Sequence, residues 1–226
     1  MEVLRDMSGI ADLITKIEKE PLRVSDYVAA NVEAGDAAGV LAAMDHYARE
    51  IAFLINIGPD KGELVREVFD RAPANPSVLE LGAFVGYSAI LFAMKVVDGG
   101  RVVSLEIGEE HAEATRRNVA HAGFADRVEV VQGDSGDSIP NLEGPFDVIF
   151  LDHWKDLYKR DLIAIETNSL IRPGSIVVAD NVGESFNPAE YLEYVRTCGR
   201  YDSEHRPATV EYSDLPDAVE VSVFKG

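Results

Sequence analysis

From residue 77 onward, the hydrophobic and polar positions of the chain switch repeatedly between two spacings. Short apolar runs rich in β-branched residues predict strands at 77–82, 101–107, 127–132, 146–152 and 175–180. Apolar positions at helical spacing predict helices at about 86–97, 109–122, 135–142, 158–170 and 188–198. Because strands and helices alternate, we expect a parallel sheet with right-handed crossovers and helices on both faces.

The two ends of the chain follow other patterns. Residues 1–72 are predicted to be helical, before Pro73 and Pro76 end the helical spacing. Two strands are expected at about 206–212 and 219–225, and so short a connection predicts an antiparallel hairpin at the sheet edge.

We therefore predict an α/β fold: a single Rossmann-like doubly wound sheet, mostly parallel with a C-terminal antiparallel hairpin, preceded by N-terminal helices. At 226 residues, one domain is expected over 1–226, with a helical cap at 1–72 and a Rossmann-like core at 77–226.

The net charge limits the classes of partner that this chain is expected to bind. The chain holds 40 acidic residues against 21 lysines and arginines, a net charge of -19. This charge repels nucleic acid phosphates and anionic lipid, so neither a nucleic acid nor a membrane partner is expected.

Cysteine content and the N-terminus bear on location. Cys198 is the only cysteine, so an internal disulfide and a cysteine metal cluster are excluded, which suits a reducing compartment. The charged residues Glu2, Arg5, Asp6 and Asp12 occupy the place of the apolar core of an export signal. We expect a cytoplasmic protein. The most apolar stretch, 78–97, contains charges and glycines and is predicted to be a strand, a turn and a helix rather than a membrane span.

Acidic and amide side chains close two neighbouring predicted strands. Asp152 ends 146–152, and Asp180 and Asn181 end the strand that begins at 175. In a parallel sheet, ligands bind beyond the carboxyl ends of the strands, and three oxygen ligands suit a hard cation, Mg²⁺ first. Lys155 follows three residues after Asp152.

The turn after the first strand carries Glu80 and two glycines, Gly82 and Gly86. This spacing is not the G-x-G-x-x-G dinucleotide fingerprint, which disfavours a nicotinamide oxidoreductase. An acid at this turn suits a cationic ligand, and Glu106, ending the second strand, is placed to accept ribose hydroxyls. Together they indicate S-adenosylmethionine. Alternatively, the glycines relieve crowding and Glu106 caps the helix at 109–122.

Three blocks, Glu80–Ser88, Phe150–Tyr158 and Ala179–Val182, resemble the signature blocks of the catechol O-methyltransferases, a family of class I S-adenosylmethionine-dependent methyltransferases. The resemblance runs from about Asn31 to Gly226. It implies Mg²⁺-dependent transfer of a methyl group from S-adenosylmethionine to one hydroxyl of a small catechol.

The resemblance also implies roles for individual residues. Asp152, Asp180 and Asn181 match the metal ligands, Lys155 the general base, and Glu220 the acid that holds the second catechol hydroxyl. The positions expected to contact the cofactor are Asn56, Ile57, Gly58, Glu80, Gly82, Tyr87, Ser88, Glu106, Ile107, Ser135, Asp152, His153 and Trp154. Phe53, Gly136 and the segment 183–186 depart from the family pattern, which alters the expected walls of the pocket.

The proposed chemistry needs these residue types. A free phenol has a pKa near 10, so a cation acting as a Lewis acid and a base are required near neutral pH. Without this context Lys155 would be interpreted as a surface lysine paired with Asp156 or Asp161. Two rival functions remain: an O-methyltransferase for a larger caffeoyl thioester, and a non-catalytic S-adenosylmethionine sensor, which would be expected to lack Lys155 or a metal ligand.

Overall fold

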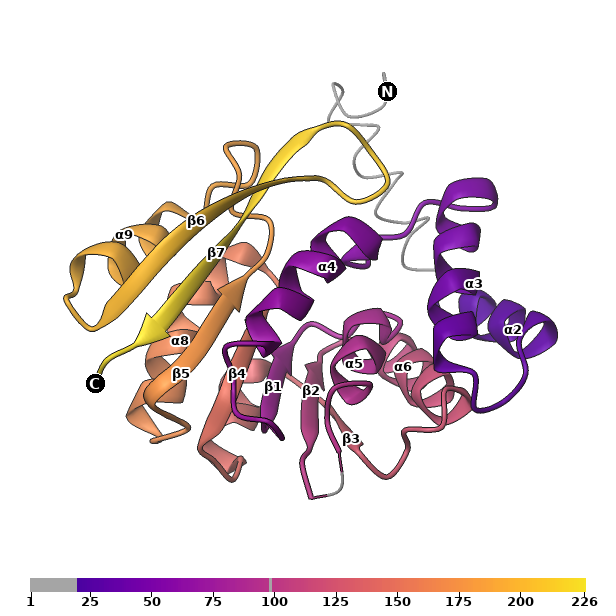
Figure 1. Ribbon diagram of the computed structural model, residues 1–226, viewed down its shortest axis with the longest axis horizontal. Coiled ribbons are helices and arrows are strands. Elements are labelled where there is room, and N and C mark those ends of the chain that lie inside the picture. The colour runs from indigo at the N-terminus through magenta and orange to yellow at the C-terminus, as the bar shows by residue number, and fades with distance from the viewer. Residues whose placement is uncertain (1–19, 98) are drawn as a thin grey trace.

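The computed structural model describes residues 20–97 and 99–226, which fold around a seven-stranded sheet in the order β3-β2-β1-β4-β5-β7-β6 (Figure 1). Its strands are β1 (Val78–Leu81), β2 (Val102–Glu106), β3 (Val128–Gln132), β4 (Phe146–Leu151), β5 (Ile171–Ala179), β6 (Tyr201–Thr209) and β7 (Pro216–Phe224). The first five pair in parallel, and β7 is antiparallel to both β5 and β6. The predicted fold class is confirmed.

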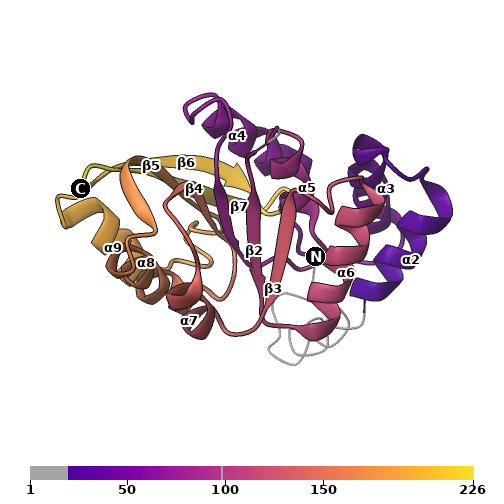
Figure 2. The ribbon, with the colours of Figure 1, turned by 90° about the horizontal axis from the view of Figure 1, so that it is seen from below.

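Helices cover both faces of the sheet (Figure 2). One face carries α2 (Pro21–Asn31), α3 (Ala37–Glu50), α4 (Gly58–Phe69), α5 (Tyr87–Ala93) and α6 (Glu109–His121). The other carries α8 (Tyr158–Thr167) and α9 (Ala189–Thr197), with the short α7 (Ser135–Ser138) and the 3₁₀ turns η2 (Ile139–Asn141) and η3 (Lys155–Leu157) nearby. Because side chains alternate along each strand, every parallel strand contributes apolar side chains to the hydrophobic layers on both faces of the sheet.

The boundaries differ from the predicted ones in β5, which begins at Ile171 rather than 175, and in the hairpin. β6 begins at Tyr201 rather than near 206, and β7 begins at Pro216 rather than near 219. The first half of β6 is the polar run Asp202–His205 on an edge strand, so its sequence has no apolar alternation to mark it. Pairing with β7 extends it: Tyr201 lies opposite Phe224.

The N-terminal prediction is tested over part of its length. Helices α2, α3 and α4 confirm helical structure within 20–72, whereas 1–19, including the charged residues at Glu2, Arg5, Asp6 and Asp12, lie outside the described residues. The apolar stretch 78–97 forms β1, a turn and α5, as predicted. Within the described part of the chain, no helix combines the length and the apolar character needed to cross a bilayer.

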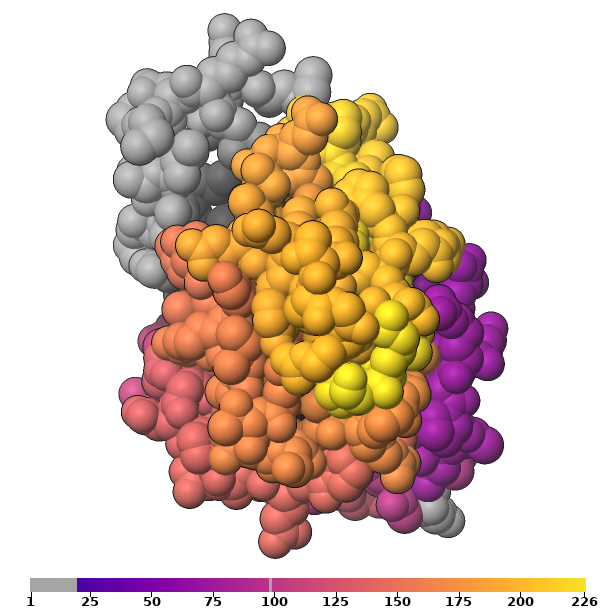
Figure 3. Space-filling view, turned by 90° about the vertical axis from the view of Figure 1, so that its left-hand side faces the viewer, coloured from indigo at the N-terminus to yellow at the C-terminus, as the bar shows by residue number. Residues whose placement is uncertain are grey.

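The last strand in sequence is not the last strand in space. β7 lies between β5 and β6, and its residues 217–222 are buried. The hairpin and α9 lie in the orange-to-yellow part of the face seen in Figure 3. This insertion brings the loop between β6 and β7 next to the carboxyl end of β5.

Candidate active site

Asp152 and Asp180 lie side by side because β4 and β5 are parallel neighbours in register. Leu151 pairs with Ala179, and each carboxylate belongs to the next residue along its strand. The backbone N–H of Asp180 donates to the Leu151 carbonyl at 2.9 Å. Asn181 follows with φ of 51°, a left-handed conformation that asparagine tolerates. The structure therefore brings together the three oxygen-bearing side chains expected to hold a metal.

Lys61 of α4 lies in the middle of this cluster and was not expected there. Its Nζ donates to both carboxylate oxygens of Asp180 at 2.8 Å and to Asp217 Oδ2 at 2.9 Å, and its side chain is 1% exposed. Glu211 Oε2 lies 3.1 Å away. Burial alone would lower the pKa of Lys61, but these carboxylates outweigh it and raise the pKa above its ordinary value. Lys61 is therefore a permanent internal cation.

Asp217 and Glu211 come from the β6–β7 hairpin and complete the cluster. Asp217 Oδ2 also accepts from the Asn181 amide nitrogen at 2.9 Å. Burial would raise the pKa of Asp217, but Lys61 and Asn181 hold it below its usual value. Glu211 Oε2 is at ion-pair distance from Lys61, yet this buried atom has no hydrogen-bond partner of good geometry. One acceptor of the cluster is thus left for another group.

Among the carboxylates of this cluster, Asp152 has the charged form that the neighbouring cations stabilise least. Burial raises its pKa to about 8; Lys155 opposes this and the neighbouring Asp180 adds to it. Lys155 Nζ lies 3.3 Å from Asp152 Oδ1 and is 24% exposed, so the pair opens toward solvent. A buried carboxylate in this condition is stabilised by a further cation.

The donor set fits a hard divalent cation. Among the described residues, no three His, Cys, Asp or Glu side chains are grouped so as to hold a metal by themselves. The expected set instead combines two carboxylates with the amide of Asn181, whose nitrogen is used by Asp217 and whose oxygen remains. Oxygen ligands suit Mg²⁺, and a bound cation would favour the ionised form of Asp152.

Glu220 does not join this cluster, which corrects the prediction that it holds the substrate. It is 1% exposed and accepts two hydrogen bonds from Arg196 of α9, at 2.7 and 2.6 Å, with His205 at 3.2 Å. Because side chains alternate along β7, Glu220 faces α9, and its neighbours Val219 and Val221 face the opposite core. Glu211 occupies the position expected of Glu220.

The turn after β1 presents a buried acid. Burial raises the pKa of Glu80 to about 7, although Ser104 and Ser88 donate to it. Its Oε1 is buried without a partner. Gly82, with φ of 100°, must be glycine, because a Cβ there would lie 2.6 Å from the Asp152 carbonyl. This half of the site fits the ammonium group of an amino-acid-bearing cofactor.

Glu106 ends β2 and also has a structural role. Its Oε2 accepts from the backbone N–H groups of Ala83 and Phe84 at 3.0 and 2.9 Å, and its Oε1 from Gly108 at 2.8 Å. Burial would raise its pKa, but His111 and these backbone donors lower it. Glu106 thus fixes the first turn and the start of α6, whereas its contact with a ribose stays a prediction. Ile107 beside it is 67% exposed.

The loop before α4 meets the hairpin. Asn56 is buried and donates to the Tyr212 hydroxyl at 2.7 Å, while its Oδ1 is unpartnered. Ile57 is buried, and Gly58 has φ of 68° with Glu211 and Tyr212 close to its Cα. The residues expected at the methionine end of the cofactor therefore lie against the hairpin that carries Glu211.

Two of the three residues expected around an adenine contact the same carboxylate, that of Asp161. His153 Nε2 and the Ser135 hydroxyl both contact Asp161 Oδ2, at 2.8 and 2.6 Å. Burial lowers the pKa of His153 despite Asp161. The contact of His153 Nε2 with Asp161 agrees with a cofactor-side role rather than a metal ligand. Trp154 is 70% exposed and free to cover a ligand.

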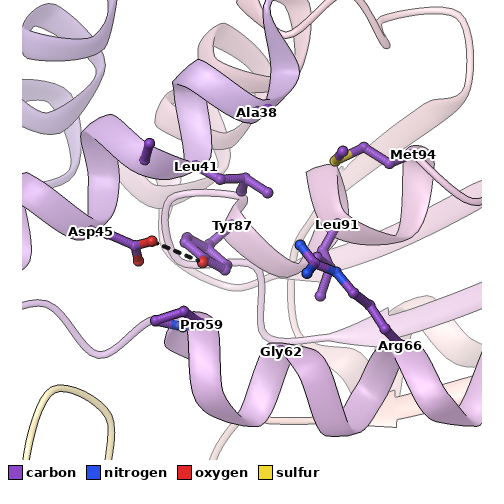
Figure 4. Close-up of a pocket in the computed structure, with 10 residues that line it drawn as sticks. Ala38, Leu41, Asp45, Pro59, Gly62, Arg66, Tyr87, Leu91 and Met94 are labelled. Atoms are coloured by element: carbon purple, nitrogen blue, oxygen red, sulfur yellow. Dashed lines mark hydrogen bonds between the residues drawn. The ribbon is translucent and has the colours of Figure 1, made fainter.

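The Tyr87 side chain lies between α3, α4 and α5 (Figure 4). Its hydroxyl donates to Asp45 of α3 at 3.4 Å, and the ring lines a cavity of about 190 Å³ between α3, α4 and α5 (Figure 4). This cavity is also lined by Arg66, Leu91 and Met94. The Tyr87 side chain therefore packs within the helical layer, and its contact with the cofactor stays a prediction.

Known proteins are similar to this chain in sequence and in fold. A family model described as O-methyltransferase matches residues 39–186. Catechol O-methyltransferase of Bos taurus is 39% identical over 97% of this chain and 82% of that protein. Catechol O-methyltransferase B of Danio rerio is 37% identical over 91% and 79%. The crystal structure of an O-methyltransferase from Bacillus cereus in complex with SAH matches this chain with a TM-score of 0.66 and 28% sequence identity. The match covers 84% of this chain and 89% of that one.

Proposed function

Because this chain belongs to the O-methyltransferase family, we propose that it transfers a methyl group from S-adenosylmethionine to one hydroxyl of a small catechol in a Mg²⁺-dependent reaction. The chain is an enzyme similar to catechol O-methyltransferase, and the products would be an O-methylated catechol and S-adenosylhomocysteine. The observation that carries the proposal is the convergence of Asp152, Asp180 and Asn181 beside Lys155. We further propose one domain over the whole chain and a cytoplasmic location.

Three side chains would hold the metal: Asp152, Asp180 and Asn181. Support comes from the raised pKa of Asp152, about 8, which reflects a buried charge that Lys155 alone does not balance. When bound, Mg²⁺ would supply a Lewis acid that makes a catechol hydroxyl more acidic, and S-adenosylmethionine would supply the methyl group. Lys61 forms an ion pair with Asp180 and so reduces the repulsion between the carboxylates of the cluster. The proposed metal ligands are therefore held close together before a cation binds.

Lys155 is proposed to accept the proton of the hydroxyl that is methylated. It lies at the open side of the cluster, 3.3 Å from Asp152, and not in the closed network around Lys61. A base at this place removes the proton where the oxygen becomes the nucleophile. In-line displacement at the methyl carbon then needs only the orientation that the site imposes on both reactants.

Glu211 is proposed to accept a hydrogen bond from the catechol hydroxyl that is not methylated. Its buried Oε2 lacks a hydrogen-bond partner and lies in the same cluster as the metal ligands. On the cofactor side, we propose that Glu80 binds the ammonium group, Glu106 the ribose, and Ser135, His153 and Trp154 surround the adenine.

The proposed reaction is tested with labelled S-adenosylmethionine and a panel containing a catechol, a matched monophenol and a caffeoyl thioester. We expect rapid methylation of the catechol alone, because a monophenol leaves buried polar groups of the site unpaired, which can discriminate by about 10⁴ or more. Products are identified by mass and ring position. Equal rates on phenol and catechol would refute a mechanism that uses two oxygens, and preference for the thioester would redirect the substrate class.

Removal of divalent metal is expected to abolish this activity. Mg²⁺ or Mn²⁺ should restore it after chelation, and Ca²⁺ should restore it poorly, because its larger and more flexible shell misplaces the substrate. Initial rates are measured after dialysis against a chelator and again after each metal is added. Full activity in the chelated protein would exclude the metal assignment.

A matched pair of variants separates the two glutamates. Glu211→Gln should lower kcat/KM for catechol by about ten- to a hundredfold, the scale of a hydrogen bond to a charged acceptor. Glu220→Gln should change kcat/KM by less than about threefold, because its partner is Arg196, although it should lower stability. Steady-state kinetics at saturating cofactor decide. The reverse order of effects would return the substrate role to Glu220.

A further inference from the structure

Asp217 at the start of β7 accepts hydrogen bonds from three residues in two segments, α4 and the loop that follows β5. Its Oδ2 accepts from Lys61 Nζ and from the Asn181 amide nitrogen, both at 2.9 Å, and its Oδ1 accepts from the backbone N–H of Gly183 at 3.1 Å. The Asp217 side chain is fully buried in this contact, at 0% exposure. Both oxygens are therefore committed to fixing other groups rather than to meeting a ligand.

The contact of Asp217 with Asn181 determines which atom of the Asn181 side-chain amide remains available to a ligand. Asn181 is 7% exposed and stands in a left-handed backbone conformation, and its side-chain nitrogen is held by Asp217. An amide whose nitrogen donates to a carboxylate has its oxygen as the remaining polar atom. A partner that fixes a metal ligand from behind is a recurrent requirement of metal sites.

The contact with Gly183 fixes the start of the loop between β5 and α9. A Cβ on Gly183 would lie 2.7 Å from the Asp217 Cα, so only glycine allows the loop to approach β7 this closely. The carbonyl of Gly183 then accepts from the N–H groups of Phe186 and Asn187 at 3.1 and 2.8 Å. Residues 183–187 are thus a compact turn, anchored at its first residue by the carboxylate that holds Asn181.

We propose that Asp217 is a positioning residue that couples the orientation of Asn181 to the position of the 183–187 loop, through one carboxylate shared between them. This inference rests on the proposed function, because Asn181 is a metal ligand only there. It adds a residue that touches neither substrate nor cofactor, and it explains why glycine stands at 183.

The test measures metal binding and loop protection in the intact protein. Mn²⁺ is used as the probe, because it takes the same oxygen ligands as Mg²⁺ and is followed by electron paramagnetic resonance. Asp217→Ala should weaken Mn²⁺ binding by about ten- to a hundredfold, as loss of a partner behind a metal ligand does. Hydrogen exchange of the 183–187 amides should rise in the same variant, whereas S-adenosylmethionine affinity without metal should stay within about twofold of wild type.

Two further variants keep the test decisive. Asp217→Asn preserves size and one acceptor oxygen, so it should fold even where Asp217→Ala does not, with a smaller loss of Mn²⁺ affinity. The matched control is Asp147→Asn, another buried aspartate at the opposite end of the sheet, paired with Arg172 and the Ser77 N–H. It should lower the melting temperature without changing Mn²⁺ affinity or exchange in the loop.

The outcomes separate this inference from the proposed function. A folded wild type that binds neither Mn²⁺ nor Mg²⁺ would overturn the proposed metal site and with it the coupling. Wild-type binding accompanied by unchanged Mn²⁺ affinity in Asp217→Ala and Asp217→Asn would overturn only the positioning role. Weakened Mn²⁺ binding with no change in loop exchange would also overturn the coupling, because both effects must come from the same carboxylate.

Discussion

Replacing Lys155 with methionine is expected to lower kcat about a hundredfold or more, the usual scale for a positioned base, with little change in S-adenosylmethionine affinity. Methionine keeps the length and apolar stem of lysine but cannot accept a proton. The Lys155 ammonium contacts Asp152 at the exposed side of the cluster, and the buried network around Lys61 does not include it. The loss should therefore appear in the chemical step, measured by single-turnover methylation at saturating Mg²⁺ and cofactor.

Lys159→Met is the matched control for that experiment. Lys159 lies four residues further along the chain and pairs with the exposed Glu190 at 3.5 Å. Surface pairs of this kind contribute about 0–1 kcal/mol, so turnover should be close to that of wild type. A normal kcat in Lys155→Met would make Lys155 a bystander, and loss of cofactor binding instead would assign it to the other half of the site.

Lys61→Met is expected to lower the free energy of unfolding of the metal-free protein by about 3–5 kcal/mol, the cost of leaving buried charges unpaired. Lys61 is the only cation that contacts Asp180, Glu211 and Asp217 among the described residues, and all four side chains are nearly inaccessible to solvent. Added Mg²⁺ should recover part of the loss, because it supplies another cation to the same carboxylates. Urea unfolding with a chelator and with Mg²⁺ measures both effects.

Lys225→Met is the control for stability. Lys225 pairs with Asp202 on the surface at 2.8 Å, where removal of the charge should cost no more than about 1 kcal/mol. If Lys61→Met unfolded at the same urea concentration as the control, the cluster would not depend on its internal cation.

The sheet and its order of elements were predictable because strong local patterns mark them. The second half of β4 and of β5 is a buried apolar run that is followed by an acidic residue, and burial on both faces gives such runs their continuous apolar character. The start of β6 was not predictable, because its polar edge residues gain their strand structure from pairing with β7. The expectation for Glu220 has another origin, because it came from the family resemblance and not from a local pattern. The structure instead places Glu211 beside Lys61 in the cluster.

Part of the site could have been found in the sequence and was missed. Lys61 stands four residues before Val65 and seven before Val68, so helical spacing places it on the buried face of α4, where a lysine needs partners. Its partners come from β5 and the hairpin, more than a hundred residues away in sequence. No local pattern specifies such a meeting, whereas Asp152 and Asp180 follow directly from the rule for strand ends.

The place of β7 between β5 and β6 sets an order of events during synthesis on the ribosome. Lys61 and Asp180 leave the exit tunnel well before Asp217, so a nascent chain ending before β7 holds half of the charged cluster and a β5 strand with one free edge. Such an edge is open to pairing with other chains. When β7 emerges, it closes that edge and delivers Asp217 to Lys61 in the same movement. Completion of the sheet at β5 and completion of the charged cluster around Lys61 therefore both depend on β7.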